Sequence, residues 1–216
     1  MNEDFDSIRI LEKMMLELHG LALEREVTVS DIVHEALDEY LYAHTNSINL
    51  FDVIHSIENA MNPADRFVTS ADPASLVIFI KSPIRYVYRP ELKYEVRIMR
   101  NDRVSVGKLS VALRTHDMET IKRFSDFIAL WIALERKYIT RSRAERIAYM
   151  TDDGYFCRQI FYPEASAHSD ARTIGDAISS YIHVFDELLK YCINQRNAQM
   201  IEQIYLDRLR TGKLTI

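Results

Sequence analysis

Two short amphipathic stretches near the start of the chain constrain its fold more than any other feature. Apolar residues recur at intervals of three and four from Leu11 to Ala22, and again from Ile32 to Leu41, which predicts two helices. Thr28 and Asp31 have the spacing of a capping box for the second helix, with Ser30 as a competing N-cap. Helices this short cannot bury both apolar stripes alone. We therefore expect the segment to have a partner, most simply a second copy of the chain.

The second stretch carries a more specific pattern. Residues 28–37 have the sequence TVSDIVHEAL. This pattern resembles the second helix of the ribbon-helix-helix family of DNA-binding dimers, in which Ser or Thr, a variable residue and Ser precede an acid, an apolar pair and Glu-Ala-Leu. The resemblance covers under a fifth of the chain. It implies that Phe5 to Ile10 forms a strand that pairs with its dimer mate, and that the resulting ribbon enters the major groove of DNA.

The resemblance also implies which residues would contact DNA. Ser7 and Arg9 would lie on the outward side of the strand and meet the base edges, with Phe5 packing nearby. The start of the second helix, including Thr28 and Ser30, would offer backbone amides to a phosphate. A plain helical hairpin that serves only for dimerisation is the alternative for this segment.

Charge is unevenly distributed along the chain. Residues 1–45 contain 11 acidic and 3 basic residues, a balance of −8, whereas the whole chain carries −5 and the remainder therefore +3. Between Lys81 and Arg114 there are 9 basic and 3 acidic residues. The most basic part of the chain thus lies outside the segment that resembles a DNA-binding module, although basic contacts supply much of the affinity for DNA.

The rest of the chain predicts a helix-rich α+β domain. A polar linker, His44 to Ser47, separates residues 1–45 from residues 46–216. Only 5 Gly and 5 Pro are present, which indicates long uninterrupted elements. Helices are expected at residues 50–61, at 117–138 after a cap at Asp117, at 141–149 as a short basic helix, and at 174–209 as one long helix or two in line.

Four strands are expected between the first two of these helices. Ser75 to Lys81 is a continuous apolar run, which is typical of a strand buried on both faces, and Arg66 to Ala74 is expected to be a loop. Residues 84–89, 93–100 and 104–115 alternate between apolar and polar side chains, and residues 155–162 add a fifth candidate. The pattern predicts an antiparallel meander of four to five strands packed with long helices, with one face exposed to water.

The exposed face of this predicted sheet is basic. Its candidate residues for an anionic ligand are Arg85, Arg89, Lys93, Arg97, Lys108 and Arg114, with Lys81, Arg100 and Arg103 nearby. One interpretation is a solvated sheet face that pairs with the acidic N-terminal segment. The other is a site for an anionic ligand or nucleic acid, because basic and aromatic side chains together hold phosphates and stack on bases. Strand parity, however, places Tyr86, Tyr88 and Tyr94 on the opposite face.

No pattern typical of an enzyme is present. The seven histidines are scattered, without the spacings of a metal site, and there is no Gly-rich phosphate loop. The adjacent residues His168, Ser169 and Asp170 are expected to cap the final helix. Two cysteines, Cys157 and Cys192, suit a reducing cytosol. We expect no catalysis, cofactor, metal or membrane span, and a cytoplasmic location.

Together these features favour a homodimeric DNA-binding transcriptional regulator with an additional α+β domain for sensing or oligomerisation. Duplex DNA is the expected partner. The first alternative is a non-enzymatic dimeric scaffold whose acidic hairpin binds a basic protein partner. The second is a sensor of an anionic small ligand through the basic sheet face.

Overall fold

The chain folds into two compact units, Met1–Ser47 and Ile48–Ile216. The computed structural model describes residues 12–45, 49–62, 66–85, 89–99, 105–139, 147–162, 170–195 and 198–214. The first unit contains helices α1 (Glu12–Arg25) and α2 (Val29–Thr45), as the apolar spacing predicted. The predicted ribbon, Phe5 to Ile10, lies outside the described residues.

Two local motifs form the turn between α1 and α2. The Val27 N–H donates to the Ala22 carbonyl (3.1 Å), and Glu26 between them has a φ of 56°, which together form a Schellman-type helix end. At the start of α2 the Thr28 N–H donates to Asp31 Oδ2 (2.9 Å) and the Asp31 N–H donates to Thr28 Oγ1 (3.1 Å). These reciprocal bonds confirm the predicted capping box.

The second unit has an α+β fold. Its described elements in chain order are α3 (Leu50–Met61), β1 (Val68–Asp72), β2 (Val77–Pro83), β3 (Glu91–Ile98), β4 (Ser105–Arg114), α4 (Met118–Tyr138), β5 (Tyr149–Asp152), β6 (Tyr155–Phe161), α6 (Ala171–Gln195) and α7 (Ala198–Arg210). The six strands form one sheet in the order β1-β2-β3-β4-β6-β5, with every neighbouring pair antiparallel. The predicted class, helix-rich α+β with an antiparallel meander, is confirmed.

Two predictions around β2 were wrong. Residues 68–72, within the expected loop, form β1, which pairs with β2 along its whole length. In the strand expected at residues 84–89, Ile84, Arg85 and Arg89 are not part of the sheet, and residues 86–88 lie outside the described part. The Ile84 N–H donates to the Pro90 carbonyl (2.9 Å) and Arg89 has a φ of 44°, so the chain reverses here.

The expected helix at residues 141–149 is only partly described, and its last three residues are not helical. Ile147 and Ala148 are not helical and Tyr149 begins β5, whereas residues 140–146 lie outside the described part. Gly154, with a φ of 69°, provides the turn of a β5–β6 hairpin. The sheet therefore has six strands and not four or five, because β1 and β5 join β2, β3, β4 and β6.

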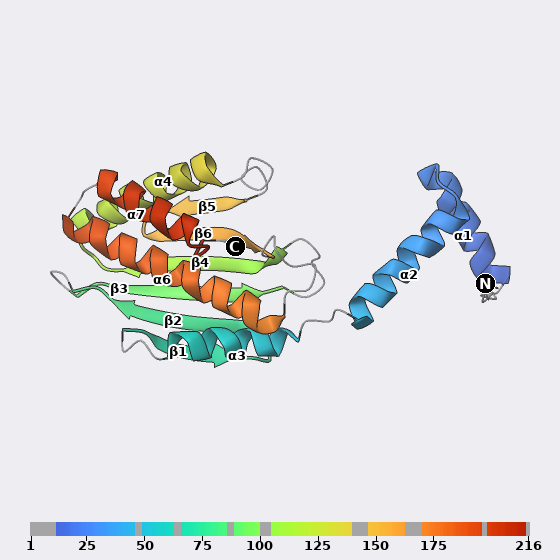
Figure 1. The fold of residues 1–216 in the computed structure, drawn as a ribbon, viewed down its shortest axis with the longest axis horizontal. Helices are drawn as coiled ribbons and strands as arrows, with labels where there is room; N and C mark the ends of the chain where they lie inside the picture. Colours follow the sequence, from blue (N-terminus) through green and yellow to red (C-terminus); the bar gives the residue numbers. More distant parts are fainter. Residues whose placement is uncertain are drawn as a thin grey trace. The chain divides into compact units, whose positions relative to one another are not determined.

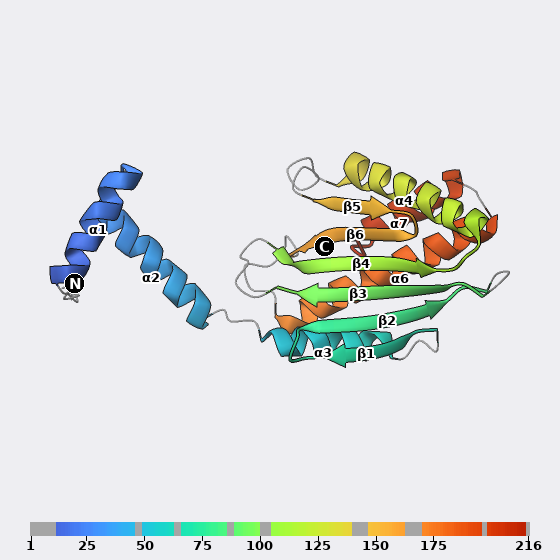
Figure 2. The ribbon, with the colours of Figure 1, turned by 180° about the vertical axis from the view of Figure 1, so that it is seen from behind.

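One face of the sheet is covered by helices. Figure 1 shows α3 and α6 lying across that face, and both views place α7 and α4 toward β5. The core between them is aromatic, with Trp131 and Phe185 ring centroids 5.0 Å apart. A Cβ on Gly175 of α6 would lie 2.4 Å from the Ser56 Cβ of α3, so a glycine is needed where these helices meet. Figure 2 shows the opposite face of strands β2 to β4 with no described helix in front of it.

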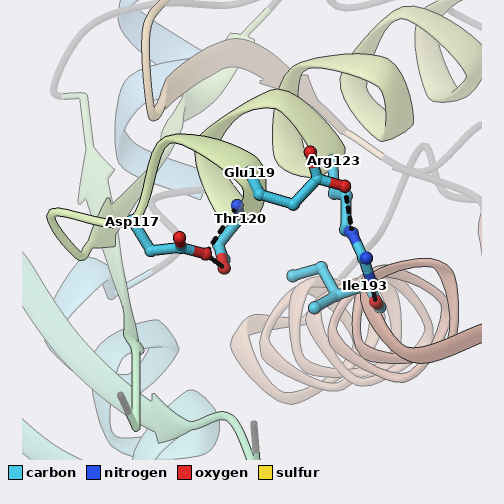
Figure 3. A network of polar contacts seen from close by, with 5 residues as sticks. All are labelled: Asp117, Glu119, Thr120, Arg123 and Ile193. Atoms are coloured by element: carbon cyan, nitrogen blue, oxygen red, sulfur yellow. Dashed lines mark hydrogen bonds and ion pairs between the residues drawn. The ribbon is translucent and has the colours of Figure 1, made fainter. Parts of the chain in front are cut away.

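The ends of α4 and α6 are joined by polar contacts (Figure 3). Asp117 caps α4 as predicted, and its Oδ2 accepts from the Thr120 N–H (3.0 Å). Arg123 Nη1 donates to the Ile193 carbonyl in the last turn of α6 (2.5 Å), where a positive charge is favourable. At the other end of α6, the predicted cap is confirmed for Asp170, whose Oδ1 accepts from the Thr173 N–H (2.7 Å).

Candidate functional surfaces

The α1–α2 hairpin exposes most of its apolar side chains. Among the described side chains of residues 13–37, only Ala22 and Ile32 are buried, each 8% exposed. Met14 is 53% exposed and Leu21 is 41% exposed. Two short helices with so small a shared contact have too little buried apolar area to hold each other in place. The hairpin therefore presents an exposed apolar surface.

The residues expected to contact DNA are only partly described. Phe5, Ser7 and Arg9 lie outside the described residues. Thr28 and Ser30 are exposed at the start of α2, where the prediction placed them.

The start of α2 already has a negative charge of its own. Hydrogen bonds from the Thr28 hydroxyl and amide hold the pKa of Asp31 below its usual value. The carboxylate of Asp31 thus occupies the Thr28 amide that was expected to be offered to a phosphate. The carboxylate of Asp31 would repel a phosphate at this helix end. The geometry therefore weakens the prediction that the Thr28 amide binds a phosphate.

The basic residues of the sheet separate into two groups. Lys81, Lys93, Arg97, Lys108 and Arg114 lie in strands β2 to β4 at alternate positions on the face away from the helices. We call this the open sheet face. In contrast, Arg85 and Arg89 lie after the end of β2 and before the start of β3, and neither is part of the sheet.

Two of these basic residues are ion-paired along the open sheet face. Arg97 Nη2 lies 2.9 Å from Glu95 Oε1, and Arg114 Nη1 lies 3.9 Å from Glu91 Oε1. Exposed pairs of this kind contribute little to stability, typically about 0–1 kcal/mol. Their effect is to orient the guanidinium groups on the face.

The strand register brings like charges together on the same face. Lys81 lies directly opposite Lys93, and Arg97 lies directly opposite Lys108. Like charges at such positions repel each other and destabilise a sheet. The sequence showed that these strands are basic, but only the register reveals the two facing pairs.

Phe79 lies on the open sheet face but was not predicted as a site residue. The apolar run from Ser75 to Lys81 was expected to be buried on both faces, and this prediction was wrong: Phe79 is half-buried and Lys81 is exposed, because no described helix covers this side of β2. The Lys93 ammonium lies 4.1 Å from the centroid of the Phe79 ring. Tyr94 does point to the covered face, as strand parity predicted, and is fully buried.

A buried polar cluster joins α4, β6 and α6 on the covered face. Arg158 Nη1 lies 2.9 Å from Glu135 Oε1, and that carboxylate also accepts from the Tyr181 hydroxyl (2.9 Å). The Trp131 indole N–H donates to the Tyr181 oxygen (2.7 Å). All four side chains are at most 1% exposed. The cluster lies inside the core and is not placed to contact a ligand from solvent.

A second polar cluster brings a serine close to a lysine. Lys190 Nζ donates to Ser82 Oγ (2.5 Å) and lies 2.9 Å from Asp186 Oδ2, and the Tyr94 hydroxyl donates to Asp186 Oδ1 (3.0 Å). A serine beside a lysine is one arrangement of a nucleophile and its base. Here Ser82 is fully buried and Lys190 is ion-paired, so the cluster is best explained as a structural link between β2, β3 and α6.

His183 lies beside this second cluster. Burial lowers the pKa of His183, and the positive charge of Arg66 lowers it further. The Arg66 Nη2 lies 2.7 Å from His183 Nδ1, which fits a neutral ring that accepts a hydrogen bond.

Within the described ranges, no group of three or more His, Cys, Asp or Glu side chains is placed to hold a metal ion. None of the helices described here is long and apolar enough to cross a membrane. Comparison with known proteins found no matching family model, no matching curated protein and no matching solved structure.

Proposed function

We propose that the protein is a homodimeric DNA-binding regulator whose N-terminal unit dimerises and contacts DNA. The observation that carries the proposal is the α1–α2 hairpin, whose turn is fixed by motifs at both helix ends while its apolar side chains stay exposed. The turn is fixed by hydrogen bonds, but the hairpin has no core of its own. This combination is expected of a module whose core forms only when it associates with another chain.

A second copy of the hairpin is the simplest partner. Symmetric association of two hairpins would bury Met14 and Leu21 of both chains in a shared core. The resemblance of residues 28–37 to the ribbon-helix-helix family supports the same arrangement. In that arrangement Phe5 to Ile10 of each chain would form the ribbon, and Arg9 would reach the base edges.

The charge of the unit shapes the expected binding. Residues 1–45 contain only 3 basic residues, so few phosphates can be neutralised by the N-terminal unit of each chain. Affinity should then depend less steeply on salt than for a strongly basic DNA-binding protein, since the slope follows the number of phosphate contacts. Specificity would come from the ribbon, and the α+β unit would add sensing or further association.

Binding of the full-length protein to a pool of random duplex DNA at low salt tests the proposal. Sequences enriched over successive rounds are then measured by fluorescence anisotropy with two variants. Arg9→Ala should weaken binding at least tenfold, as expected for the loss of one base contact. Arg25→Ala removes an equal charge from the hairpin, where Arg25 pairs with Glu35 at 3.3 Å, and should have little effect. Unchanged affinity of Arg9→Ala would refute the ribbon, and failure of any duplex to bind would refute the regulator.

A further inference from the structure

The open sheet face presents a pattern of charge and aromatic rings that suits one class of ligand. We infer that this face, centred on Phe79, binds single-stranded nucleic acid. The inference goes beyond the proposed function, since it concerns the α+β unit and a different form of nucleic acid.

The first argument is the placement of positive charge. Lys81 and Lys93 form one facing pair, and Arg97 and Lys108 form another. Lys93 and Arg97 are four residues apart on β3, a distance of about 13 Å along the strand. A single phosphate cannot contact both pairs, whereas an extended polyanion with regularly spaced charges can. The repulsion within each pair would be relieved by the bound phosphates.

The second argument is the position of Phe79 relative to these pairs. Phe79 lies opposite Glu95, midway between the register positions of the two pairs. The order along the face is therefore positive charge, aromatic ring, positive charge. This is the order of phosphate, base and phosphate in a nucleic acid strand, and stacking on an aromatic ring is tolerant of base identity.

A second aromatic ring lies farther across the same face. Tyr155 of β6 is half-buried opposite Ala112, and its hydroxyl donates to Ser110 Oγ (3.1 Å). Three strand spacings separate β2 from β6, so these two strands lie about 14 Å apart across the sheet. Between them β3 presents Lys93 and Glu95, and β4 presents the small side chains of Ser110 and Ala112.

The acidic residues of the face fit the same ligand. Glu95 and Glu91 are each paired with an arginine, so they hold Arg97 and Arg114 in place more than they repel phosphates. Lys93, which now lies over the Phe79 ring, would exchange this contact for a phosphate when a base stacks there. A single strand exposes the faces of its bases, whereas a duplex does not, so the aromatic rings favour the single strand.

Anisotropy of the full-length protein with fluorescent oligo(dT) and oligo(U) of about ten nucleotides tests this inference. Phe79→Ala should weaken binding about tenfold or more, and Phe79→Tyr should retain it. Lys108→Ala should weaken binding and reduce the salt slope by roughly one. Lys122→Ala is the matched control, since Lys122 is exposed on α4, away from the sheet face, and should change neither quantity.

Three results would overturn the inference. One is the absence of oligonucleotide binding at low salt. Another is binding that neither Phe79→Ala nor Lys108→Ala weakens, once thermal unfolding has shown that both variants are folded. The third is binding of a polyglutamate peptide as tight as that of the oligonucleotide, when Phe79→Ala weakens neither. That result would assign the face to an acidic protein segment.

The outcome is separable from that of the proposed regulator. Arg9→Ala is expected to affect only duplex DNA, and Phe79→Ala only the single strand. If the protein binds no duplex DNA but binds oligo(U) in a way that depends on Phe79, the proposed regulator is refuted and this inference is supported.

Discussion

Glu26 holds the backbone conformation on which the turn of the N-terminal hairpin depends. Its φ of 56° lies in the left-handed region, which is unfavourable for residues other than glycine by about 1–2 kcal/mol. The residue that follows, Val27, completes the helix end through its bond to Ala22. The strain is retained because two helices must reverse direction within a few residues.

Replacing Glu26 with glycine should therefore stabilise the hairpin. We expect Glu26→Gly to raise its free energy of unfolding by about 1 kcal/mol, because glycine adopts this conformation without a steric penalty. Amide hydrogen exchange of α1 and α2 in the full-length protein measures this quantity locally. Glu24→Gly is the matched control: Glu24 is inside α1, where glycine should cost about 1 kcal/mol. Equal effects of the two changes would contradict the assigned turn.

At the scale of elements, the contact between α3 and α6 positions the helical layer over the sheet. Gly175 allows α6 to approach α3 so closely that an added Cβ would lie 2.4 Å from Ser56 Cβ and 3.2 Å from the Ile57 backbone nitrogen. The backbone atom cannot move aside cheaply, so the contact tolerates no larger residue.

Gly175→Ala should lower the stability of the α+β unit. Alanine gains about 1 kcal/mol in helix propensity, but overpacking of a core contact costs about 1–3 kcal/mol, so the net change is expected to be a destabilisation. Thermal unfolding followed by circular dichroism measures it. The double variant Ser56→Gly with Gly175→Ala removes the Ser56 Cβ that clashes with the new methyl group. It should recover part of the stability lost in Gly175→Ala. A more stable Gly175→Ala variant would show that the helices can separate without cost.

At the scale of the whole molecule, the two units differ in how they are stabilised. The unit Ile48–Ile216 has a continuous core of buried side chains, whereas the unit Met1–Ser47 buries only two of its described apolar side chains. Met14 and Leu21 are seven residues apart and lie on nearly the same side of α1, since seven residues make almost two turns. Their exposure makes this side of α1 the expected centre of a dimer contact.

Met14→Lys with Leu21→Lys should prevent the proposed dimer from forming and leave a monomer. Light scattering coupled to size-exclusion chromatography would then give a mass near 25.3 kDa instead of about twice that value. Met118→Lys is the control, because Met118 on α4 is 72% exposed and belongs to the other unit. A dimer that survives the double substitution would place the contact elsewhere and remove the main support for the proposed regulator.

Local chemistry was enough to predict several parts of this protein. The capping box of Thr28 and Asp31, the N-caps Asp117 and Asp170 and the alternation along β3 and β4 depend on residues a few positions apart, and each is present in the structure. The helix-rich α+β class followed from the same periodicities. The residues of the ribbon, in contrast, stay a prediction.

Only the tertiary structure showed that β1 and β5 form at the edges of the sheet, and which residues of neighbouring strands lie opposite each other. The edge strands β1 and β5 are short, and their extended conformation comes from pairing with β2 and β6, which no local pattern encodes. The basic residues were visible in the sequence of the chain, but the facing pairs Lys81–Lys93 and Arg97–Lys108 and the place of Phe79 between them arise from strand register. Strand register decides which residues of neighbouring strands lie opposite each other, even when they are distant in sequence. The candidate surface therefore exists only once the strands have paired.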